Sequence, residues 1–196
     1  MKKAIFIMTM AVIATATSTY AQTNGCVNDS KAQAMQLEAE GWKSDTNHTI
    51  EYELIQYDKY RESGDYSTHV GTTPQPMSNS AAAKNLAKFQ AMLDAVNVVE
   101  HEFQAMSQYM EGLIEESEIG VYVTTGVDRF KARISGDFYT QFAIYRQKNG
   151  KYEYRVFCYM DKHALETMCY DIFEELVVEY KGKDVAAKVQ QLRNLK

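Results

Sequence analysis

Cys158, His163 and Cys169 are the side chains whose types and spacing best suit covalent chemistry. A thiol beside an imidazole can act as a nucleophile once the imidazole takes its proton. The two cysteines flank the junction between an expected strand and an expected helix, which brings both near His163 in sequence. The surrounding residues contain no third orienting group and no glycine pattern typical of an oxyanion hole. We therefore expect no catalytic residue and a protein that is not an enzyme.

The same cysteines raise the question of a disulfide. The chain has three, an odd number, so Cys26, Cys158 and Cys169 cannot all pair within one molecule. A bridge between Cys158 and Cys169 is possible if their Cα atoms lie about 4–7 Å apart. The alternative is that both are buried thiols that behave as small apolar side chains.

The histidines lack the spacing of a metal site. The segment HEFQA, residues 101–105, resembles a zinc-protease motif, but Ala105 stands where the second histidine ligand is needed. His48, His69 and His163 show no ligand spacing either. The sequence therefore predicts no metal and no other cofactor.

Residues 1–21, MKKAIFIMTMAVIATATSTYA, have the layout of a secretory signal peptide: two lysines, an apolar run and a small residue before the cut. We expect an exported protein that is periplasmic or associated with the outer membrane. A competing interpretation makes Cys26 a lipid-attachment site, although Thr23 stands where that motif usually has leucine. Membrane attachment is expected only if Cys26 is lipidated.

The charge balance argues against one class of partner. Removing residues 1–21 takes two lysines, so 21 basic residues become 19 against 26 acidic ones, and the formal charge moves from −5 to −7. A negative chain with scattered lysines has no electrostatic surface for phosphate backbones. Nucleic acid is not an expected partner.

The elements that must position these residues form one α+β domain over residues 65–181. Its small antiparallel sheet is expected to comprise a short strand before Gly71 and a hairpin over 137–161. A long helix over 80–114 and a C-terminal helix over 162–181 should pack on this sheet. The chain outside this domain divides into an N-terminal helical extension over 22–64 and a C-terminal tail over 182–196.

The long helix is predicted from NSAAAKNLAKFQAMLDAVNVVEHEFQAMSQYM, residues 79–110, with Asn79 or Ser80 as the N-cap. Its alanines should let the first half approach another backbone closely. Apolar residues recur every three or four positions and predict one buried face. They are Leu86, Phe89, Leu93, Val96, Val99, Phe103, Met106, Met110 and Leu113.

Two further segments fit either a helix or a strand. Residues 49–62 alternate as in a strand, but their charges favour a helix capped by Thr49. Residues 121–135 favour a helix that follows a break near Gly120. An earlier helix, residues 30–42, should bury Met35, Ala39 and Trp42, which fall on one helical face.

The hairpin is the clearest β signal, because Asn149-Gly150 is a preferred type I′ turn between two alternating runs. A two-residue turn fixes the register and places Phe142 opposite Phe157. One face lacks charge and should be covered by the helices: Tyr139, Ala143, Tyr145, Tyr154, Val156, Cys158 and Met160. The other face carries Phe142, Ile144, Arg146, Glu153, Arg155, Phe157 and Tyr159.

This second face is a candidate binding surface. Phe142, Phe157 and Tyr159 would form an apolar patch beside Arg155, and patches of that kind can mark interaction sites. The alternative is that the N-terminal helix and Trp42 cover the face.

The alanine-rich NSAAAKNLAKFQAMLDAV after a short strand, the hairpin containing IYRQ and YEYRV, and a closing helix carry a family resemblance over roughly residues 65–181. In this order of elements the chain resembles the LPP-type small bacterial lipoprotein family, which is related to the N-terminal domain of flagellar assembly protein T. The resemblance implies an envelope location and a structural or assembly role. It implies no active-site residues.

We therefore expect a non-enzymatic cell-envelope protein with a structural, assembly or protein-binding role, whose partner is another protein or an envelope assembly. The alternative is a module that binds peptide or glycan through tyrosines of the 138–160 hairpin, since tyrosine suits half-hydrated contact surfaces. The tyrosines considered for that groove are Tyr145, Tyr152, Tyr154 and Tyr159.

Overall fold

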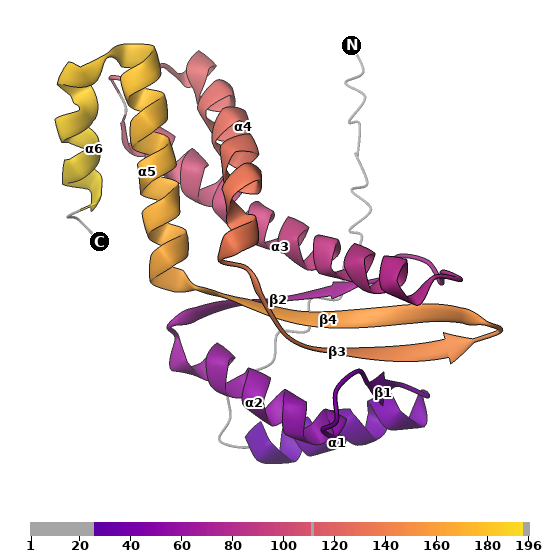
Figure 1. Cartoon of the computed structure of the whole chain (residues 1–196). Coiled ribbons are helices and arrows are strands. Elements are labelled where there is room, and N and C mark those ends of the chain that lie inside the picture. Colours follow the sequence, from indigo (N-terminus) through magenta and orange to yellow (C-terminus); the bar gives the residue numbers. More distant parts are fainter. Residues whose placement is uncertain (1–25, 111, 194–196) are drawn as a thin grey trace, which may run out of the picture.

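The computed structural model describes residues 26–110 and 112–193, and the predicted signal peptide lies outside them. The expected α+β class is confirmed, since helices surround a four-stranded antiparallel sheet (Figure 1). The elements are α1 (Cys26–Ala39), β1 (Lys43–Ser44), α2 (Ile50–Ser63), β2 (Tyr66–Thr72), α3 (Ser80–Tyr109), α4 (Glu116–Arg133), η1 (Ile134–Gly136), β3 (Tyr139–Lys148), β4 (Lys151–Asp161), α5 (Lys162–Lys181), η2 (Lys183–Val185) and α6 (Ala186–Arg193).

The sheet has the strand order β1-β3-β4-β2, so β2 and the two-residue β1 form its edges. Strands β3 and β4 make the predicted hairpin. Asn149 and Gly150 both have positive φ, 54° and 72°, as a type I′ turn requires. The predicted register is confirmed from the turn to the pair Phe142 and Phe157.

A bulge in β3 alters the register beyond that pair. It lies between Thr140 and Phe142, and Tyr139 then pairs with Tyr159. Because a slip of one residue turns a side chain to the opposite face, Tyr139 leaves the face on which we expected it. The predicted burial of Tyr139 under the helices is wrong: it is 50% exposed.

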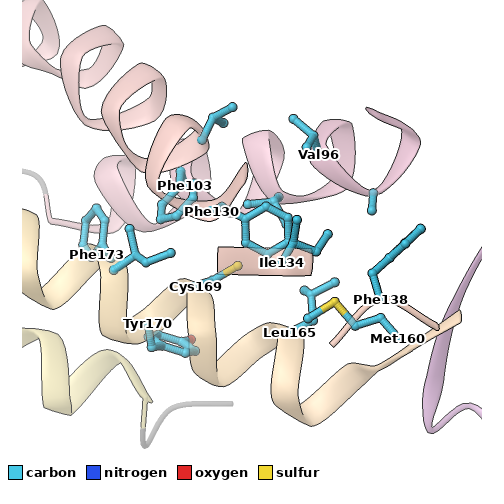
Figure 2. Packing of buried hydrophobic residues seen from close by; sticks show 14 of the residues in the cluster. Val96, Phe103, Phe130, Ile134, Phe138, Met160, Leu165, Cys169, Tyr170 and Phe173 are labelled. Carbon is cyan, nitrogen blue, oxygen red and sulfur yellow. The ribbon is translucent and has the colours of Figure 1, made fainter. Parts of the chain in front are cut away.

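The larger core lies between α3 and one face of the sheet, and it continues between α3, α4 and α5 beyond the end of the sheet (Figures 1 and 2). The predicted close approach of the alanines is confirmed, because Ala83, Ala87, Ala91 and Ala95 are fully buried. Phe89 of the predicted apolar face is instead exposed. The alanine row faces the sheet, where the short distance between the backbones leaves no room for a ring.

Helix α3 ends earlier than predicted, and α4 begins at Glu116. The start of α4 is set by a carboxylate, since Glu118 accepts a hydrogen bond from the main-chain N–H of Glu115 at 2.9 Å. The predicted helix over 121–135 is confirmed through Arg133, but the predicted break near Gly120 is wrong because Gly120 lies inside α4.

Helices α1 and α2 cover the other face of the sheet and enclose a second core (Figure 1). The helical prediction for 49–62 is confirmed, and Thr49 accepts a hydrogen bond from the N–H of Tyr52. Met35 is exposed, against our expectation, because α1 buries Ala34 and Leu37 instead. The second core consists of Ala34, Leu37, Trp42, Ile50, Leu54, Tyr57, Phe142, Ile144 and Phe157.

Helix α5 begins after Asp161, whose carboxylate accepts a hydrogen bond from Ala164 N–H. It ends at Gly182, as predicted. In the segment that we expected as a tail, Val189 and Leu192 of α6 join the larger core. None of the helices in the described part of the chain is both long and apolar enough to cross a membrane.

Candidate functional site

The predicted apolar binding patch is not on the surface. Phe142 is 2% exposed and Phe157 is 5% exposed, because α1 and α2 cover them. The two rings stack with their centroids 4.2 Å apart, and Tyr57 packs edge-on against both. The alternative interpretation, in which the N-terminal helix and Trp42 cover this face, is confirmed.

Arg155 stacks on a buried ring. Its guanidinium carbon lies 4.7 Å from the Trp42 ring centroid, and that of Arg146 lies 4.8 Å from it. Arg146 also pairs with Glu153 at 2.6 Å. These contacts join the second core to the sheet, and cation–π contacts of this kind are stabilising.

Tyr159 belongs to a cluster that the sequence did not reveal. Its ring stacks on Tyr60 and Tyr139, with centroid distances of 4.4 Å and 5.6 Å, and Tyr66 packs edge-on against Tyr60 and Tyr159. We call Tyr60, Tyr66, Tyr139 and Tyr159 the tyrosine cluster. Burial and the neighbouring Tyr60 raise the pKa of Tyr159.

The other hairpin tyrosines lie on the opposite face, so the predicted four-tyrosine groove is wrong. Tyr145 and Tyr154 stack on each other with centroids 5.6 Å apart. Tyr154 belongs to the larger core, and Tyr145 and Tyr152 pack against it. The alternation of β4 separates these residues from Tyr159.

The proposed disulfide is absent, since no bond joins Cys158 to Cys169. Both thiols are buried in the larger core, and Cys169 points toward Ile134 (Figure 2). Burial raises the pKa of Cys158 to about 11, which keeps the thiol protonated and a poor nucleophile at neutral pH. His163, the base considered for it, is exposed at the start of α5.

A surface hollow of about 480 Å³ lies beside the start of α5 and includes His163. Two of its charged side chains are already paired, since Arg133 bonds Glu175 and Asp171 bonds Arg193, and Asp161 accepts from Ala164 N–H. Among residues 26–110 and 112–193, no three His, Cys, Asp or Glu side chains converge as metal ligands. This hollow offers few polar groups to a ligand.

The outer edge of β2 presents main-chain groups to solvent. At the two ends of the strand, Lys162 N–H donates to Asp65 O, and Thr73 N–H donates to Tyr154 O. Hydrogen-bonded pairs alternate along an antiparallel ladder, so the odd-numbered residues of β2 bond β4. The even-numbered Thr68, Val70 and Thr72 therefore direct their N–H and C=O groups outward. No element in the described part of the chain bonds them.

A groove of about 360 Å³ runs along this edge, between β2 and α3. Its walls are mainly polar. Its lining residues are Val70, Gly71, Thr72, Gln90, Leu93, Asp94 and Asn97.

A hydrogen-bonded chain of three side chains adjoins the groove. The Nδ1 atom of His69 lies 2.8 Å from Asp94 Oδ2, and its Nε2 atom lies 2.8 Å from Ser67 Oγ. A carboxylate can only accept, so Nδ1 carries a hydrogen, and a neutral imidazole then accepts from the Ser67 hydroxyl at Nε2. These hydrogen bonds join β2 to α3.

The order serine, histidine, aspartate is that of hydrolase triads, but the surroundings differ. The His69 side chain is 2% exposed and that of Asp94 is 57% exposed, whereas a triad carboxylate is buried. The N–H of Ser67 points toward β4 in the ladder, so it is not available to stabilise an oxyanion. The arrangement suits orientation of the Asp94 carboxylate better than acyl transfer.

The sequence analysis did not find the hydrogen bonds that join Ser67, His69 and Asp94. Ser67 and His69 are two apart in a strand and therefore share a face, which is a signal that the sequence does contain. The position of Asp94 depends on how α3 crosses β2, and no local pattern encodes it.

Comparison with known proteins identifies no family model, no curated protein and no solved structure that matches this chain. The resemblance to the LPP-type family stays a prediction.

Proposed function

We propose that this chain is a non-enzymatic envelope protein that binds an extended segment of a protein partner, which adds to β2 as a fifth strand. The observation that carries the proposal is the outward direction of the main-chain groups of Thr68, Val70 and Thr72 beside the groove. In strand addition, main-chain hydrogen bonds supply affinity and neighbouring pockets supply specificity.

The edge offers three N–H donors and three C=O acceptors in a regular row. Each hydrogen bond to a peptide backbone contributes about 0.5–1.5 kcal/mol net of the water that it replaces. A ligand that also fills the groove gains binding free energy from contact with Leu93 and the neighbouring surface of α3. An extended peptide of six or seven residues therefore suits the surface better than a compact ligand.

The edge is already held in the shape that a partner strand needs. Gly71 packs directly against the backbone of α3, and Tyr57 Oη donates to the carbonyl oxygens of His69 and Cys158 at 3.1 Å. Binding then orders only the ligand, which limits the entropic cost.

The test is selection from a random seven-residue peptide library on the folded protein, followed by affinity measurement on two variants. Val70→Pro removes an outward N–H without removing a bond to β4, and Val70→Thr keeps that N–H. We expect selected peptides to bind Val70→Thr normally and Val70→Pro weakly.

Amide hydrogen exchange of the unaltered protein gives a second measurement that does not depend on the fold of a variant. The amides of Val70 and Thr72 should exchange quickly alone and slowly with peptide bound. Equal affinity for both variants, or unchanged exchange, would show that peptides bind elsewhere.

The proposed location is the periplasm or the outer membrane, supported by the layout of residues 1–21. Intact mass of the natively exported protein, with fractionation, tests it. A soluble chain beginning at Gln22 means a periplasmic binder, and a membrane-bound chain beginning at a lipid-modified Cys26 means an anchored one. A chain that retains residues 1–21 in the cytoplasm would contradict the proposal.

A second candidate function is glycan binding at the tyrosine cluster. Tyr139 stacks on Tyr159 and remains 50% exposed, so part of its ring is open to a sugar. Tyr139→Ala should abolish binding to a glycan array. Tyr52→Ala, which removes an exposed tyrosine outside the cluster, should have no effect. Equal loss in both variants, or no binding, would exclude this candidate.

A further inference from the structure

We propose that the peptide accepted at β2 carries a basic side chain that pairs with Asp94. This inference rests on the proposed function and names the chemistry of the ligand.

The charge of the groove comes from one residue. Of the seven residues that line it, Asp94 alone is ionisable, and the others offer amide, hydroxyl or apolar groups. A lysine or arginine is the side chain that complements a single carboxylate in such a wall. An acidic side chain in the same place would be repelled.

Asp94 has one oxygen engaged and one available. Its Oδ2 atom accepts from His69, while no hydrogen bond to Oδ1 occurs within residues 26–110 and 112–193. More than half of the side chain is exposed. A ligand cation can therefore approach Oδ1 without displacing His69.

The carboxylate is held in place before a ligand arrives. His69 is buried, and its ring is fixed at both nitrogens by Ser67 and Asp94. A side chain that already occupies one orientation loses little rotamer freedom on forming an ion pair, so more of the Coulomb attraction contributes to binding. Ser67 and His69 are positioning residues in this arrangement.

Strand geometry restricts the basic residue to alternate positions. Side chains of an added strand point in turn toward α3 and away from it. A lysine that faces α3 lies on the side of Asp94, and the same lysine moved by one position faces away. This difference supplies a control with identical composition and charge.

The experiment uses the peptides selected on the full chain. In each peptide that contains lysine, the lysine is replaced by norleucine, which keeps the aliphatic chain and removes the charge, or is moved by one position. We expect either change to weaken binding about twofold to fivefold, as befits a partly exposed ion pair. The loss should shrink as salt is added.

Two variants of the protein test whether Asp94 causes the preference for lysine. On Asp94→Asn the lysine and norleucine peptides should bind equally. On Asp128→Asn, which removes an exposed carboxylate in α4, the preference for lysine should persist. A twofold or larger preference that survives in Asp94→Asn overturns the inference, and so do selected peptides without basic residues. In both cases the strand addition itself stands, whereas a failure to select any peptide overturns the proposed function as well.

Discussion

Gly71 in β2 lies against the main chain of Ala87 in α3, so a Cβ built at position 71 would overlap the carbonyl oxygen of Ala87. The main-chain nitrogen of Ala91 stands in the way as well. Neither atom can move without displacing a whole helix from the sheet. This contact sets the distance between α3 and β2, and with it the width of the groove.

We expect Gly71→Ala to lower the free energy of unfolding by about 3 kcal/mol or more, because the added methyl group meets rigid backbone. Urea denaturation measures the change. Gly120→Ala in α4 is the matched control: a Cβ there meets nothing within 4 Å, and helix propensity should make it stabilising by about 0.5–1 kcal/mol. If Gly71→Ala left the free energy of unfolding unchanged, α3 would have to lie farther from the sheet than the structure places it.

Tyr57→Phe should destabilise the protein by about 1–2 kcal/mol, because it removes a buried donor from the carbonyl oxygens of His69 and Cys158. Tyr122→Phe should be neutral or stabilising by up to about 1 kcal/mol. Its buried hydroxyl has no hydrogen-bond partner in the described part of the chain. Thermal denaturation of both variants compares them directly. Equal losses would contradict the hydrogen-bond assignment.

Stability should fall in alkaline solution. Burial raises the pKa of Cys158 from 9.0 to about 11 and that of Tyr122 from 10.0 to about 12. The unfolded chain therefore loses these protons at lower pH than the folded chain does, and the stabilisation present below about pH 9 disappears as pH rises to about 12. Urea midpoints across this range measure the effect. Cys158→Ala should show a smaller decline between pH 9 and 11, and an identical decline would contradict the role of this thiol.

Ser67 should not react with a fluorophosphonate probe that labels serine hydrolases. Its hydroxyl hydrogen-bonds His69, but Asp94 is exposed and the Ser67 N–H points into the ladder. Mass spectrometry of the treated protein gives the result. Labelling at Ser67 that is lost in His69→Gln would mean that the three residues act as a catalytic triad after all.

The sequence predicts those parts of the fold that local patterns specify. Asn149-Gly150 sets the hairpin and its register, and Thr49 and Asn79 mark the starts of α2 and α3. The bulge after Thr140 has no such marker, and it changes the face of Tyr139. Alternation alone could not tell whether Phe142 is covered, because the cover comes from a segment about 90 residues earlier in the chain.

The candidate site was less predictable for the same reason. Its edge strand was visible in sequence, but its place at the outside of the sheet follows from the strand order. The contact between His69 and Asp94 spans 25 residues and two kinds of element. Neither His69 nor Asp94 has a sequence pattern that marks it as part of a site. Only the packing of α3 against Gly71 brings the two side chains together.

The composition of β2 has a consequence for the solubility of the protein. Natural sheets usually protect their edge strands from self-association with lysine, proline or inward charge. The segment YSTHVGT has no proline, lysine, arginine or acidic residue, and Val70 on it is exposed. Concentrated protein without ligand should therefore aggregate first through this strand, and an occupying peptide should raise its solubility.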